Sequence, residues 1–525
     1  GLAVDPSDSY EKALDFLDRA VGARAPRALR EAFLANGHEA VAKLEDNSHV
    51  QYQVRQLHPD YMTELPGSVL RGRAIEPKPF DGRLLGKALK LIRPPIPEFT
   101  VLGGMMVDRD DIGHLLNVGK SFKSFRYAMR IILRHQMDRL LHGRGTRLVM
   151  GNALIGRLLL SLRERKVTIV NRCNVTALRT QGEGETGKSV TGVVLEQDGV
   201  RREVVVRGGV VLASGGFNRH PKRRGEWLPG VSPDWCPAAP GHTGSAQDLA
   251  IAIGASYGAT ELASDPAEDG KVLSHAFWAP VSIRKRADGS VAAFPHFVMD
   301  RGKPGMITVN QRGERFVNES TSYHLFGLAM QAADRHAPSI PAWLVCDAEA
   351  LARYGLGMIR PGAKEGASIA PFLADGYLTQ GRTVAELAAK MGADPAVLTA
   401  TIERFNAAAE RGVDAEFQRG STDYQRANGD ATRSAKNPCL GALRTGPYYA
   451  IRLYPGDIGA ATGLRTDAAA RVLDQRGEPI AGLYACGNDM HSIMGGTYPA
   501  PGITIGPGLT FAYLAAQDAV ARSAT

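Results

Sequence analysis

An apolar strand, a glycine-rich loop and a helix are predicted in succession near the C-terminus, between Gly482 and Val520. The stretch reads GLYACGNDMHSIMGGTYPAPGITIGPGLTFAYLAAQDAV, and its loop contains Gly, Pro and a single tyrosine, Tyr498. Glycine lets the backbone approach a ligand closely, and the first turn of a helix offers unpaired N–H groups with a positive partial charge. The stretch therefore predicts a binding site for a flat, electron-rich ligand.

Length and cysteine content set the limits for the rest of the chain. A chain of 525 residues is too long for one ordinary core, so we expect two or more domains. The five cysteines are scattered without a CxxC pair, which indicates neither a disulfide framework nor a metal site and favours a reducing, cytoplasmic location. No apolar run is long enough to predict a membrane span.

The net charge of +9 is concentrated in part between Gly119 and Arg147. There Phe122, Phe125, Met129, Ile132 and Leu133 recur at helical spacing among Lys120, Lys123, Arg126, Arg130 and Arg134. The first interpretation is a solvated basic face over a core-facing apolar stripe. The alternative is a helix on a membrane surface that delivers an apolar substrate, a peripheral contact through residues 119–147. A nucleic-acid partner is not predicted, because no recognition motif accompanies the charge.

The order of the predicted elements indicates a β-rich unit that a mixed segment interrupts. A mostly helical region begins with a helix at Tyr10 and extends to about Leu162. The β-rich runs VTIVNRCNVTAL, VTGVVLE and REVVVRGGVVLASGGF follow, and the last is typical of a buried strand that ends at Gly215 and Gly216. The region from about Leu262 to Pro447 mixes strands and helices, and strands return in YYAIRLYP and GLYACG.

Two nucleotide-binding motifs can be excluded. The segment GNALIGRL (151–158) has the glycine spacing of a P-loop, but Arg157 and Leu158 stand where Lys and Ser or Thr are required, so we expect the start of a helix. No GxGxxG dinucleotide fingerprint occurs in the sequence.

Three motifs, VLASGGF (211–217), RGERFVNESTSY (312–323) and the C-terminal stretch, follow one another in the order and spacing of one flavoprotein family. The sequence resembles the fumarate reductase/succinate dehydrogenase flavoprotein superfamily, and within it the FAD-dependent 3-ketosteroid Δ1-dehydrogenases. The segments HPDYM (58–62) and MGNALIGRLLLSL (150–162) also resemble that branch. The resemblance implies an α/β fold in which an α+β substrate-capping domain interrupts a Rossmann-like FAD-binding domain. The expected domains are 1–263 and 448–525 for the FAD-binding domain and 264–447 for the capping domain.

Members of that family begin with a strand, a GxGxxG turn, a ribose-binding Glu and a Gly-Gly-Thr segment, which have no counterpart here. We therefore expect an N-terminally incomplete copy that lacks the first βαβ unit of the FAD-binding domain. Because the pyrophosphate normally sits on the helix of that unit, we expect the chain as it stands to retain FAD poorly.

The resemblance implies FAD as the cofactor and places its isoalloxazine ring beside the C-terminal loop. The helix that opens at Gly506-Pro507-Gly508 would direct free N–H groups and its positive end at the flavin N1/O2 edge. The implied cofactor-binding residues are Val175, Ala213, Ser214, Gly215, Gly216, Asp248, Gly487, Asn488, Gly506, Pro507, Gly508 and Leu509.

The resemblance also implies four catalytic residues. Tyr498 and Gly502 would donate hydrogen bonds to the ketone oxygen, where charge develops as the α-proton leaves. Tyr323 would be the base that removes this proton, and Tyr61 would assist it. The family motif Tyr-Pro-Gly-x-Gly is Tyr-Pro-Ala-Pro-Gly here, so Ala500 departs from it.

The implied activity is a flavin-dependent dehydrogenation that introduces a C=C bond next to the ketone of a steroid-like, apolar substrate; the electron acceptor is not implied. One alternative is a fumarate reductase-like or Δ4-ketosteroid flavoenzyme. The fumarate reductase alternative has His491 as its support, and the uncharged loop from Met494 to Leu509 disfavours a dicarboxylate. Another alternative is a flavin-free homologue that only binds an apolar ligand.

Overall fold

The structure, a computed structural model, describes residues 3–182, 189–258, 275–286, 288–298, 300–434 and 436–524. The chain forms two compact units: unit 1 contains Gly1–Pro6, His38–Leu57 and Arg71–Arg172, and unit 2 contains Ser7–Gly37, His58–Leu70 and Cys173–Thr525. The expected domain boundary between residues 263 and 264 lies outside the described residues.

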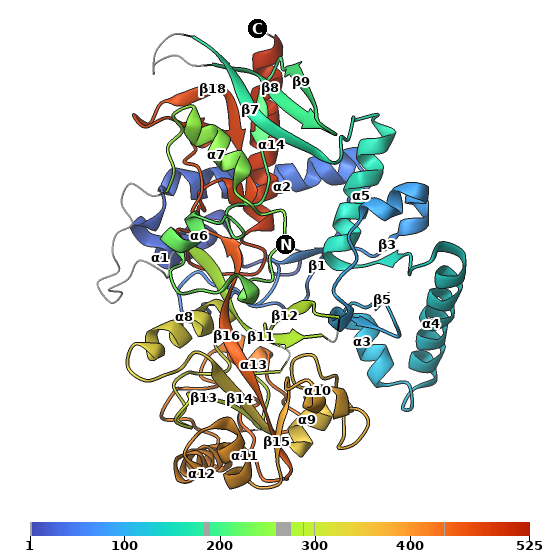
Figure 1. The fold of residues 1–525 in the computed structure, drawn as a ribbon, viewed down its shortest axis with the longest axis vertical. Coiled ribbons are helices and arrows are strands. Elements are labelled where there is room, and N and C mark those ends of the chain that lie inside the picture. The colour runs from blue at the N-terminus through green and yellow to red at the C-terminus, as the bar shows by residue number, and fades with distance from the viewer. Residues whose placement is uncertain are drawn as a thin grey trace. The chain divides into compact units, whose positions relative to one another are not determined.

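Unit 2 contains a six-stranded sheet that includes the strand ahead of the glycine-rich loop (Figure 1). Its strands are β7 (Cys173–Gln181), β8 (Ser189–Gln197), β9 (Val200–Val205), β10 (Val210–Leu212), β17 (Arg471–Leu473) and β18 (Pro479–Ala485). They follow the order β10-β18-β8-β7, with β17 beside β18 and β9 beside β8. β10 and β18 are parallel, with Leu212 opposite Ala485, so the segments that leave their carboxyl ends meet at one edge.

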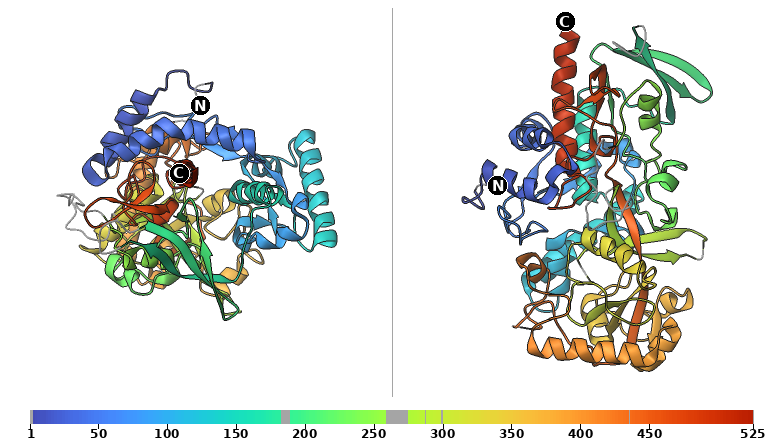
Figure 2. Two further views of the ribbon diagram at one scale, coloured as in Figure 1. Left: turned by 90° about the horizontal axis from the view of Figure 1, so that it is seen from above. Right: turned by 90° about the vertical axis from the view of Figure 1, so that its left-hand side faces the viewer.

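The predicted sequence of strand, loop and helix at the C-terminus is confirmed. After β18 the chain forms the loop and then α14 (Ile505–Ala524), which Figure 2 shows as one long helix that ends at the C-terminus. Pro507 lies in its first turn, and the Tyr484 hydroxyl of β18 donates a hydrogen bond of 2.7 Å to Asp518 of α14. The predicted helix at Tyr10 is α1 (Tyr10–Val21), where the Ser9 side chain accepts a hydrogen bond from the Lys12 N–H.

One predicted strand differs from the structure. The run REVVVRGGVVLASGGF was predicted to be a buried strand, but it divides into β9 and the three-residue β10. All six residues of β9 are exposed, because β9 pairs only with β8 and forms a hairpin at the sheet margin. The apolar pattern of Val204 and Val205 therefore did not indicate burial.

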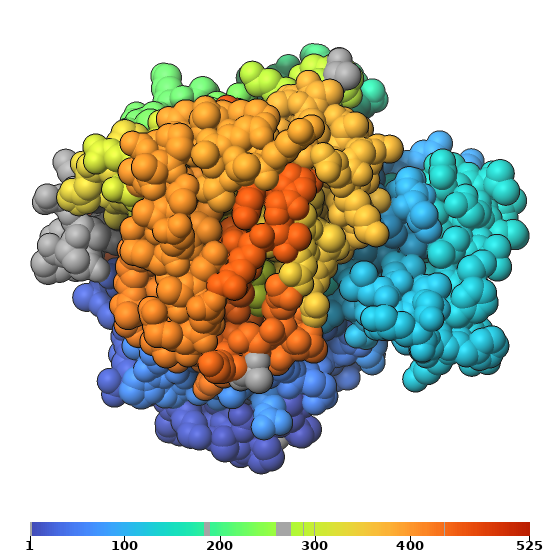
Figure 3. All heavy atoms as spheres, turned by 90° about the horizontal axis from the view of Figure 1, so that it is seen from below, coloured from blue at the N-terminus to red at the C-terminus, as the bar shows by residue number. Residues whose placement is uncertain are grey.

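The second sheet of unit 2 also has six strands, in the order β12-β11-β16-β14-β13 with β15 beside β16. Their bounds are β11 (Ala276–Lys285), β12 (Val291–Pro295), β13 (Met306–Val309), β14 (Ala342–Asp347), β15 (Thr379–Gly381) and β16 (Tyr448–Ala460). The helices of this part are α8 (Tyr323–Asp334), α9 (Ala348–Tyr354), α10 (Ala370–Ala374), α11 (Val384–Met391), α12 (Pro395–Arg411) and α13 (Asp423–Ala427). The segment of α11 and α12 forms much of the orange surface in Figure 3.

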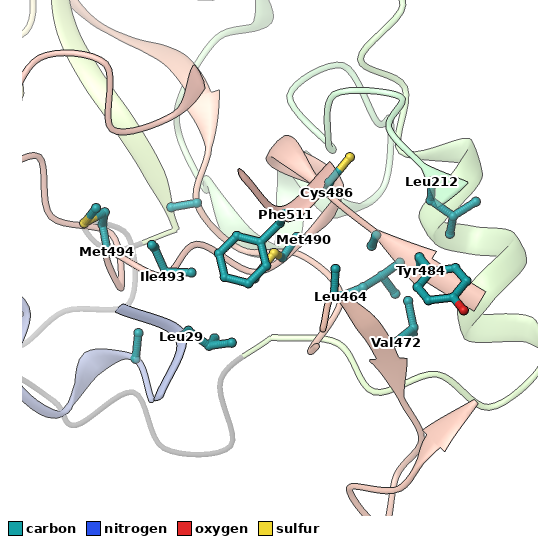
Figure 4. Packing of buried hydrophobic residues seen from close by; sticks show 14 of the residues in the cluster. Leu29, Leu212, Leu464, Val472, Tyr484, Cys486, Met490, Ile493, Met494 and Phe511 are labelled. Atoms are coloured by element: carbon teal, nitrogen blue, oxygen red, sulfur yellow. The ribbon is translucent and has the colours of Figure 1, made fainter. Parts of the chain in front are cut away.

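A hydrophobic core joins the first sheet of unit 2 to the C-terminal loop. Figure 4 shows Leu212 and Tyr484 near the strands, and Met490, Ile493 and Phe511 on the segments that follow. The same cluster of buried residues includes Tyr323 and Tyr498. The loop that carries Tyr498 therefore packs into this core.

Unit 1 consists of short hairpins and helices. Its elements are β1 (Tyr52–Val54), β2 (Ile75–Pro77), β3 (Phe80–Asp81), β4 (Thr100–Val101), β5 (Met105–Met106), β6 (Arg147–Leu148), α3 (Arg109–Leu116), α4 (Phe122–His142) and α5 (Met150–Glu164). α5 confirms that GNALIGRL belongs to the start of a helix.

Three α-helices in the described part of the chain remain. α6 (Arg223–Trp227) and α7 (Ser245–Ala252) follow β10 in unit 2, and the residues of α2 (Arg27–Asn47) are divided between the two units.

The preferred interpretation of the basic segment was wrong in one respect. α4 forms as predicted, but its apolar stripe does not face a core: Phe122 is 80% exposed and Leu133 is 58% exposed. Its buried side instead carries one large apolar residue, Ile131, among the small or polar residues Ser124, Ala128, His135 and Asp138. Asp138 accepts hydrogen bonds from the Thr146 N–H and hydroxyl, which compensate for the burial of its carboxylate. None of the described helices is long and apolar enough to cross a membrane.

Candidate active site

Three tyrosines that lie far apart in the sequence meet in unit 2. The hydroxyls of Tyr61 and Tyr323 are 3.2 Å apart. The ring centroids of Tyr323 and Tyr498 are 5.1 Å apart, and those of Tyr61 and Tyr498 are 5.7 Å apart with the rings nearly parallel. The structure therefore brings together the three tyrosines that the resemblance implied.

Tyr61 is fixed by main-chain contacts on a loop. Its N–H donates a hydrogen bond of 2.7 Å to the carbonyl of Pro499, the residue after Tyr498. The loop closes on itself, because the Asp60 N–H binds the Val69 carbonyl and the Val69 N–H binds the Asp60 carboxylate. The position of Tyr61 is thus tied directly to that of Tyr498.

Tyr323 is the first residue of α8, and a buried ionic cluster anchors the segment before it. Ser322 caps the helix by accepting a hydrogen bond from the Leu325 N–H. Glu319 is fully buried and binds the guanidinium groups of Arg315 at 2.7 Å and Arg419 at 3.1 Å. Charge-assisted bonds of this kind fix geometry, so the backbone that leads to Tyr323 has little freedom.

The loop after Tyr498 accommodates the departure from the family motif. The left-handed backbone conformation falls on Gly502, at φ 80°, and Ala500 is not among the described residues with positive φ. A Cβ on Gly502 would meet no atom within 4 Å, so the glycine is required here by its backbone conformation rather than by lack of space. The Gly502 carbonyl accepts the N–H of Gly506 at 2.8 Å, which joins the turn to α14.

Burial dominates the electrostatics of the tyrosines. It raises the pKa of Tyr323 well above the ordinary value of 10, and the neighbouring Tyr61 and Tyr498 raise that pKa further. Burial also raises the pKa of Tyr61 and of Tyr498. Hydrogen bonds with Tyr323 and Thr504 partly offset the rise in the pKa of Tyr498. The three phenols are therefore neutral hydrogen-bond donors at neutral pH.

Two further residues at this site were missed by the sequence analysis. The ring of Tyr424 on α13 lies 5.0 Å from that of Tyr61, and burial raises its pKa to about 12. Arg301 is fully buried and donates to the carbonyls of His296, Glu319 and Thr321. Its charge opposes the rise in pKa of both Tyr61 and Tyr424. No local motif marks either residue, and only the tertiary fold brings them to the cluster.

Most of the cofactor-binding residues expected in the C-terminal stretch line a narrow cavity. Gly487, Asn488, Pro507 and Gly508 form its walls together with Phe277 and His491. A second cavity of about 520 Å³ shares His491 as a wall. Glycine surfaces, the first turn of α14 and an unpartnered buried imidazole are features that suit the polar edge of a flavin. The chemistry of these residues thus fits the polar edge of FAD, although the narrow cavity itself has a volume of only about 20 Å³.

Ser214, Gly215 and Gly216, three more of the predicted cofactor-binding residues, lie in the turn after β10. Asp489 accepts hydrogen bonds from the N–H groups of Ser214 and Gly216, and from the Ser214 hydroxyl at 3.1 Å. This carboxylate therefore holds the turns after β10 and β18 together. A Cβ on Gly215 would lie 2.5 Å from the His242 ring, so this position requires glycine.

The other predicted cofactor residues are spread over several elements. The side chain of Asp248, on α7, is half-exposed, forms an ion pair with Arg223 and accepts a hydrogen bond of 3.0 Å from Nε2 of His220. Val175 lies on β7 and is 42% exposed. Ala213 leads into the turn after β10, and Gly506 and Leu509 lie in the first turns of α14. A cofactor role for all these residues stays a prediction.

Comparisons with known proteins agree with the fold and with FAD as the cofactor. The sequence model of the FAD binding domain family matches residues 2–505. The chain is 35% identical over 495 residues to a 4-oxocyclohex-2-ene-1-carboxylate 5-dehydrogenase of Sinomonas cyclohexanicum, covering 94% of this chain and 80% of the relative. It is 33% identical over 525 residues to a 3-oxosteroid 1-dehydrogenase of Mycolicibacterium smegmatis, covering 98% of this chain and 87% of the relative.

A solved structure extends the agreement to three dimensions. The 3-ketosteroid Δ1-dehydrogenase of Sterolibacterium denitrificans, in complex with 1,4-androstadiene-3,17-dione, matches with a TM-score of 0.87 at 32% identity and covers 98% of this chain and 89% of that chain. A flavocytochrome c3 fumarate reductase shares the fold alone, with a TM-score of 0.57 at 17% identity. The chain therefore belongs to the FAD binding domain family and is an FAD-dependent oxidoreductase akin to the 3-oxosteroid 1-dehydrogenases.

Proposed function

We propose that the protein introduces a C=C bond next to the ketone of an apolar cyclic substrate, by removal of an α-proton and transfer of the β-hydride to FAD. The observation that carries this proposal is the cluster of Tyr61, Tyr323 and Tyr498, in which the Tyr61 and Tyr323 hydroxyls lie 3.2 Å apart and the Tyr323 ring packs against that of Tyr498. Phe277, whose ring packs against Tyr498, also lines the narrow cavity with Gly487 and Gly508. When bound, FAD supplies the acceptor for the hydride. The protein supplies the base and the donors to the ketone oxygen.

The ketone oxygen requires hydrogen-bond donors, because it gains negative charge as the α-proton leaves. Tyr498 is a neutral phenol at neutral pH and can donate. Gly502 lies in the same loop, four residues further on, and we assign the second donor to its N–H. Both groups precede α14, so the donors and the flavin-binding helix N-terminus belong to one continuous segment.

Tyr323 accepts the α-proton in this proposal, with Tyr61 as its partner. A buried phenol with a raised pKa is a poor base until its proton is removed. The Tyr61 hydroxyl at 3.2 Å offers a path for that proton, and the charge of Arg301 favours the ionised form of Tyr61. Tyr61 thus acts as a relay between Tyr323 and the rest of the cluster.

The substrate class follows from the walls of the site. The loop from Met494 to Leu509 carries no charged residue, and Phe277 and Phe297 lie against Tyr498 and Tyr323, with ring centroids 5.2 and 4.9 Å apart. Such walls favour an uncharged, steroid-like ketone. The relative from Sinomonas is named for a carboxylated cyclohexenone, so a smaller keto acid is the second candidate.

A substrate panel tests both candidates. The enzyme is incubated with an artificial electron acceptor and either saturated and unsaturated 3-ketosteroids or 4-oxocyclohexanecarboxylate, and product is identified by mass and position of the double bond. We expect turnover of 3-ketosteroids with a new bond at Δ1. Turnover of the keto acid alone, or a product with the bond at Δ4, would contradict the proposed substrate or regiochemistry. Failure of every ketone would favour a binding protein without redox activity.

We further propose that residues 264–447 cap the flavin, with 1–263 and 448–525 as the FAD-binding parts. The main support is that Tyr323 and Tyr424, which reach the cluster, come from the middle segment, whereas Tyr61 and Tyr498 come from the flanking ones. The substrate would then bind between the two kinds of segment, as ligands commonly do at domain junctions.

Peripheral contact with a membrane is the proposal for α4 of unit 1. Phe122, Phe125, Met129 and Leu133 are exposed on a helix that also carries Lys and Arg, a combination that suits an anionic lipid surface. Flotation with vesicles that contain anionic lipid should recover the protein, and recovery should fall for a Phe122→Ser/Leu133→Ser variant. Equal recovery with neutral vesicles would contradict the charge argument.

The five cysteines are all free, which supports the expected cytoplasmic location.

A further inference from the structure

The His491 side chain is buried without a hydrogen-bond partner. It follows β18 and lies in the loop ahead of Tyr498, and it is 8% exposed. Its main-chain N–H donates to the Leu464 carbonyl at 2.7 Å, so the backbone is well fixed. Neither Nδ1 nor Nε2 of the ring has a partner among the residues that the structure describes. Buried polar groups in proteins almost always have a hydrogen-bond partner, so the unpaired His491 ring indicates that a ligand binds beside it.

The imidazole is neutral at physiological pH. Burial lowers its pKa to about 4, and the nearby His275 and Arg465 act in the same direction. No carboxylate is among the groups that shift its titration. A neutral imidazole has one N–H donor and one acceptor nitrogen. It can therefore donate a hydrogen bond to an uncharged or an electron-rich partner without the cost of burying a cation.

The ring lies between two cavities of unit 2. It lines the narrow cavity formed by Gly487, Asn488, Pro507 and Gly508, and also the cavity of about 520 Å³. The larger cavity is lined by Gly22 to Arg27 and by Arg465 and Thr466, and its volume is within the range that holds small ligands. The hydroxyl of Thr466 is likewise buried without a partner among the described residues. His491 is the residue that the two cavities share.

We propose that His491 contacts bound FAD and donates its imidazole N–H to a polar atom of the isoalloxazine ring. The walls of the narrow cavity come from Gly487 and Asn488 on one side and from the first turn of α14 on the other, and His491 completes this wall. The proposal rests on the assignment of FAD as cofactor and adds a residue that neither the sequence motifs nor the helix N-terminus provide. It does not depend on which ketone is the substrate.

A donor at this position would act on the reduced flavin more than on the oxidised one. Reduction makes the N1/O2 edge of the ring electron-rich, so a hydrogen bond to that ring strengthens on reduction. His491 would then raise the reduction potential of the bound flavin and favour its reduction by substrate. Its removal should lower the midpoint potential as well as the affinity.

Flavin binding without substrate tests the proposal. The chain is titrated with FAD, FMN and lumiflavin, with flavin fluorescence and absorbance as readouts, and the midpoint potential is measured for the complex. His491→Phe keeps an aromatic ring of similar size and removes both nitrogens, whereas His491→Asn keeps a donor. We expect roughly tenfold weaker flavin binding for His491→Phe, with a shifted absorption band and a lower midpoint potential. His491→Asn should retain most of the affinity.

Thr466→Val is the matched control, because it removes the other unpartnered polar group of the larger cavity and leaves the narrow cavity intact. It should leave the flavin spectrum and potential unchanged. Circular dichroism and a thermal melt establish that each variant is folded. A folded His491→Phe protein with wild-type affinity, spectrum and potential would overturn the proposal. Equal effects of His491→Phe and Thr466→Val would also overturn it. A wild-type chain that binds none of the three flavins would overturn the assignment of FAD, and the proposal with it.

Discussion

The hydroxyls of Tyr61 and Tyr323 lie 3.2 Å apart, although 262 positions separate the two residues in the sequence. Tyr61 belongs to a loop tied to the Tyr498 segment, and Tyr323 begins a helix of the middle region. Two phenols at hydrogen-bond distance can exchange a proton. This pair therefore divides the work of the proposed base between a residue that meets the substrate and a residue that carries the proton away.

Tyr323→Phe should lower kcat by roughly 10²- to 10⁴-fold, the usual loss when a general base is removed. Substrate binding should change little, because the ring and its packing against Phe297 remain. Steady-state kinetics with a confirmed ketone measure kcat, and a binding titration measures the affinity for the substrate. Near-normal turnover by Tyr323→Phe would remove Tyr323 as the base.

Tyr498→Phe should weaken substrate binding and slow turnover together. The hydroxyl of Tyr498 contacts the ketone in the ground state, and it also stabilises the charge that develops on that oxygen. Both KM and kcat should therefore be affected, in contrast to Tyr323→Phe. An effect on KM alone would show that the donor acts in binding only.

Tyr61→Phe should be the mildest of the three substitutions. Tyr61 is only partly buried, and a water molecule at its hydroxyl position could take over part of a relay. We expect a loss in kcat that is clearly smaller than that of Tyr323→Phe, with a solvent isotope effect that changes because the relay changes. If both variants lose turnover equally, Tyr61 is as essential as Tyr323.

Local patterns of the sequence were sufficient for the elements that carry the site. The strand at Leu483, the glycine-rich loop and the helix at Pro507 follow from short-range signals, and the structure forms them as β18, the loop and α14. The family motifs were needed to select Tyr61, Tyr323 and Tyr498 among fifteen tyrosines. Periodicity and propensity carry no information on which of these rings meet.

Features that depend on tertiary contacts were not predictable. The stripe with Phe122 and Leu133 has the spacing of a core face but is exposed, because the buried side of α4 carries mostly small residues and polar groups such as Asp138, which is hydrogen-bonded. Tyr424 and Arg301 join the tyrosine cluster through chain segments that no motif marks. Amphipathic spacing identifies the apolar face of a helix. Residues elsewhere in the chain determine whether another element covers that face.

Glu319→Gln should destabilise unit 2 strongly. Glu319 is fully buried between Arg315 and Arg419, and loss of its charge leaves two buried guanidinium groups with less compensation. Breaking a buried ion pair on one side costs about 3–5 kcal/mol in free energy of unfolding. Chemical denaturation measures the change, and Lys390→Gln, which breaks an exposed ion pair on α11, is the control with about 0–1 kcal/mol expected. Equal effects of the two substitutions would contradict the structural role of Glu319.

The dependence of turnover on pH follows from the raised pKa of Tyr323. Burial and the neighbouring Tyr61 and Tyr498 disfavour the phenolate, so the folded-state pKa lies well above 10 and the ionised fraction is small at neutral pH. If Tyr323 must be ionised to take the α-proton, kcat should rise with pH, by up to about tenfold per pH unit, and should not reach a plateau below pH ~10. Single-turnover reduction of the bound flavin over pH 6 to 10 isolates this step from reoxidation. The rise should vanish in Tyr323→Phe, and a wild-type rate that is independent of pH over this range would exclude an ionising tyrosine from the proton-removal step.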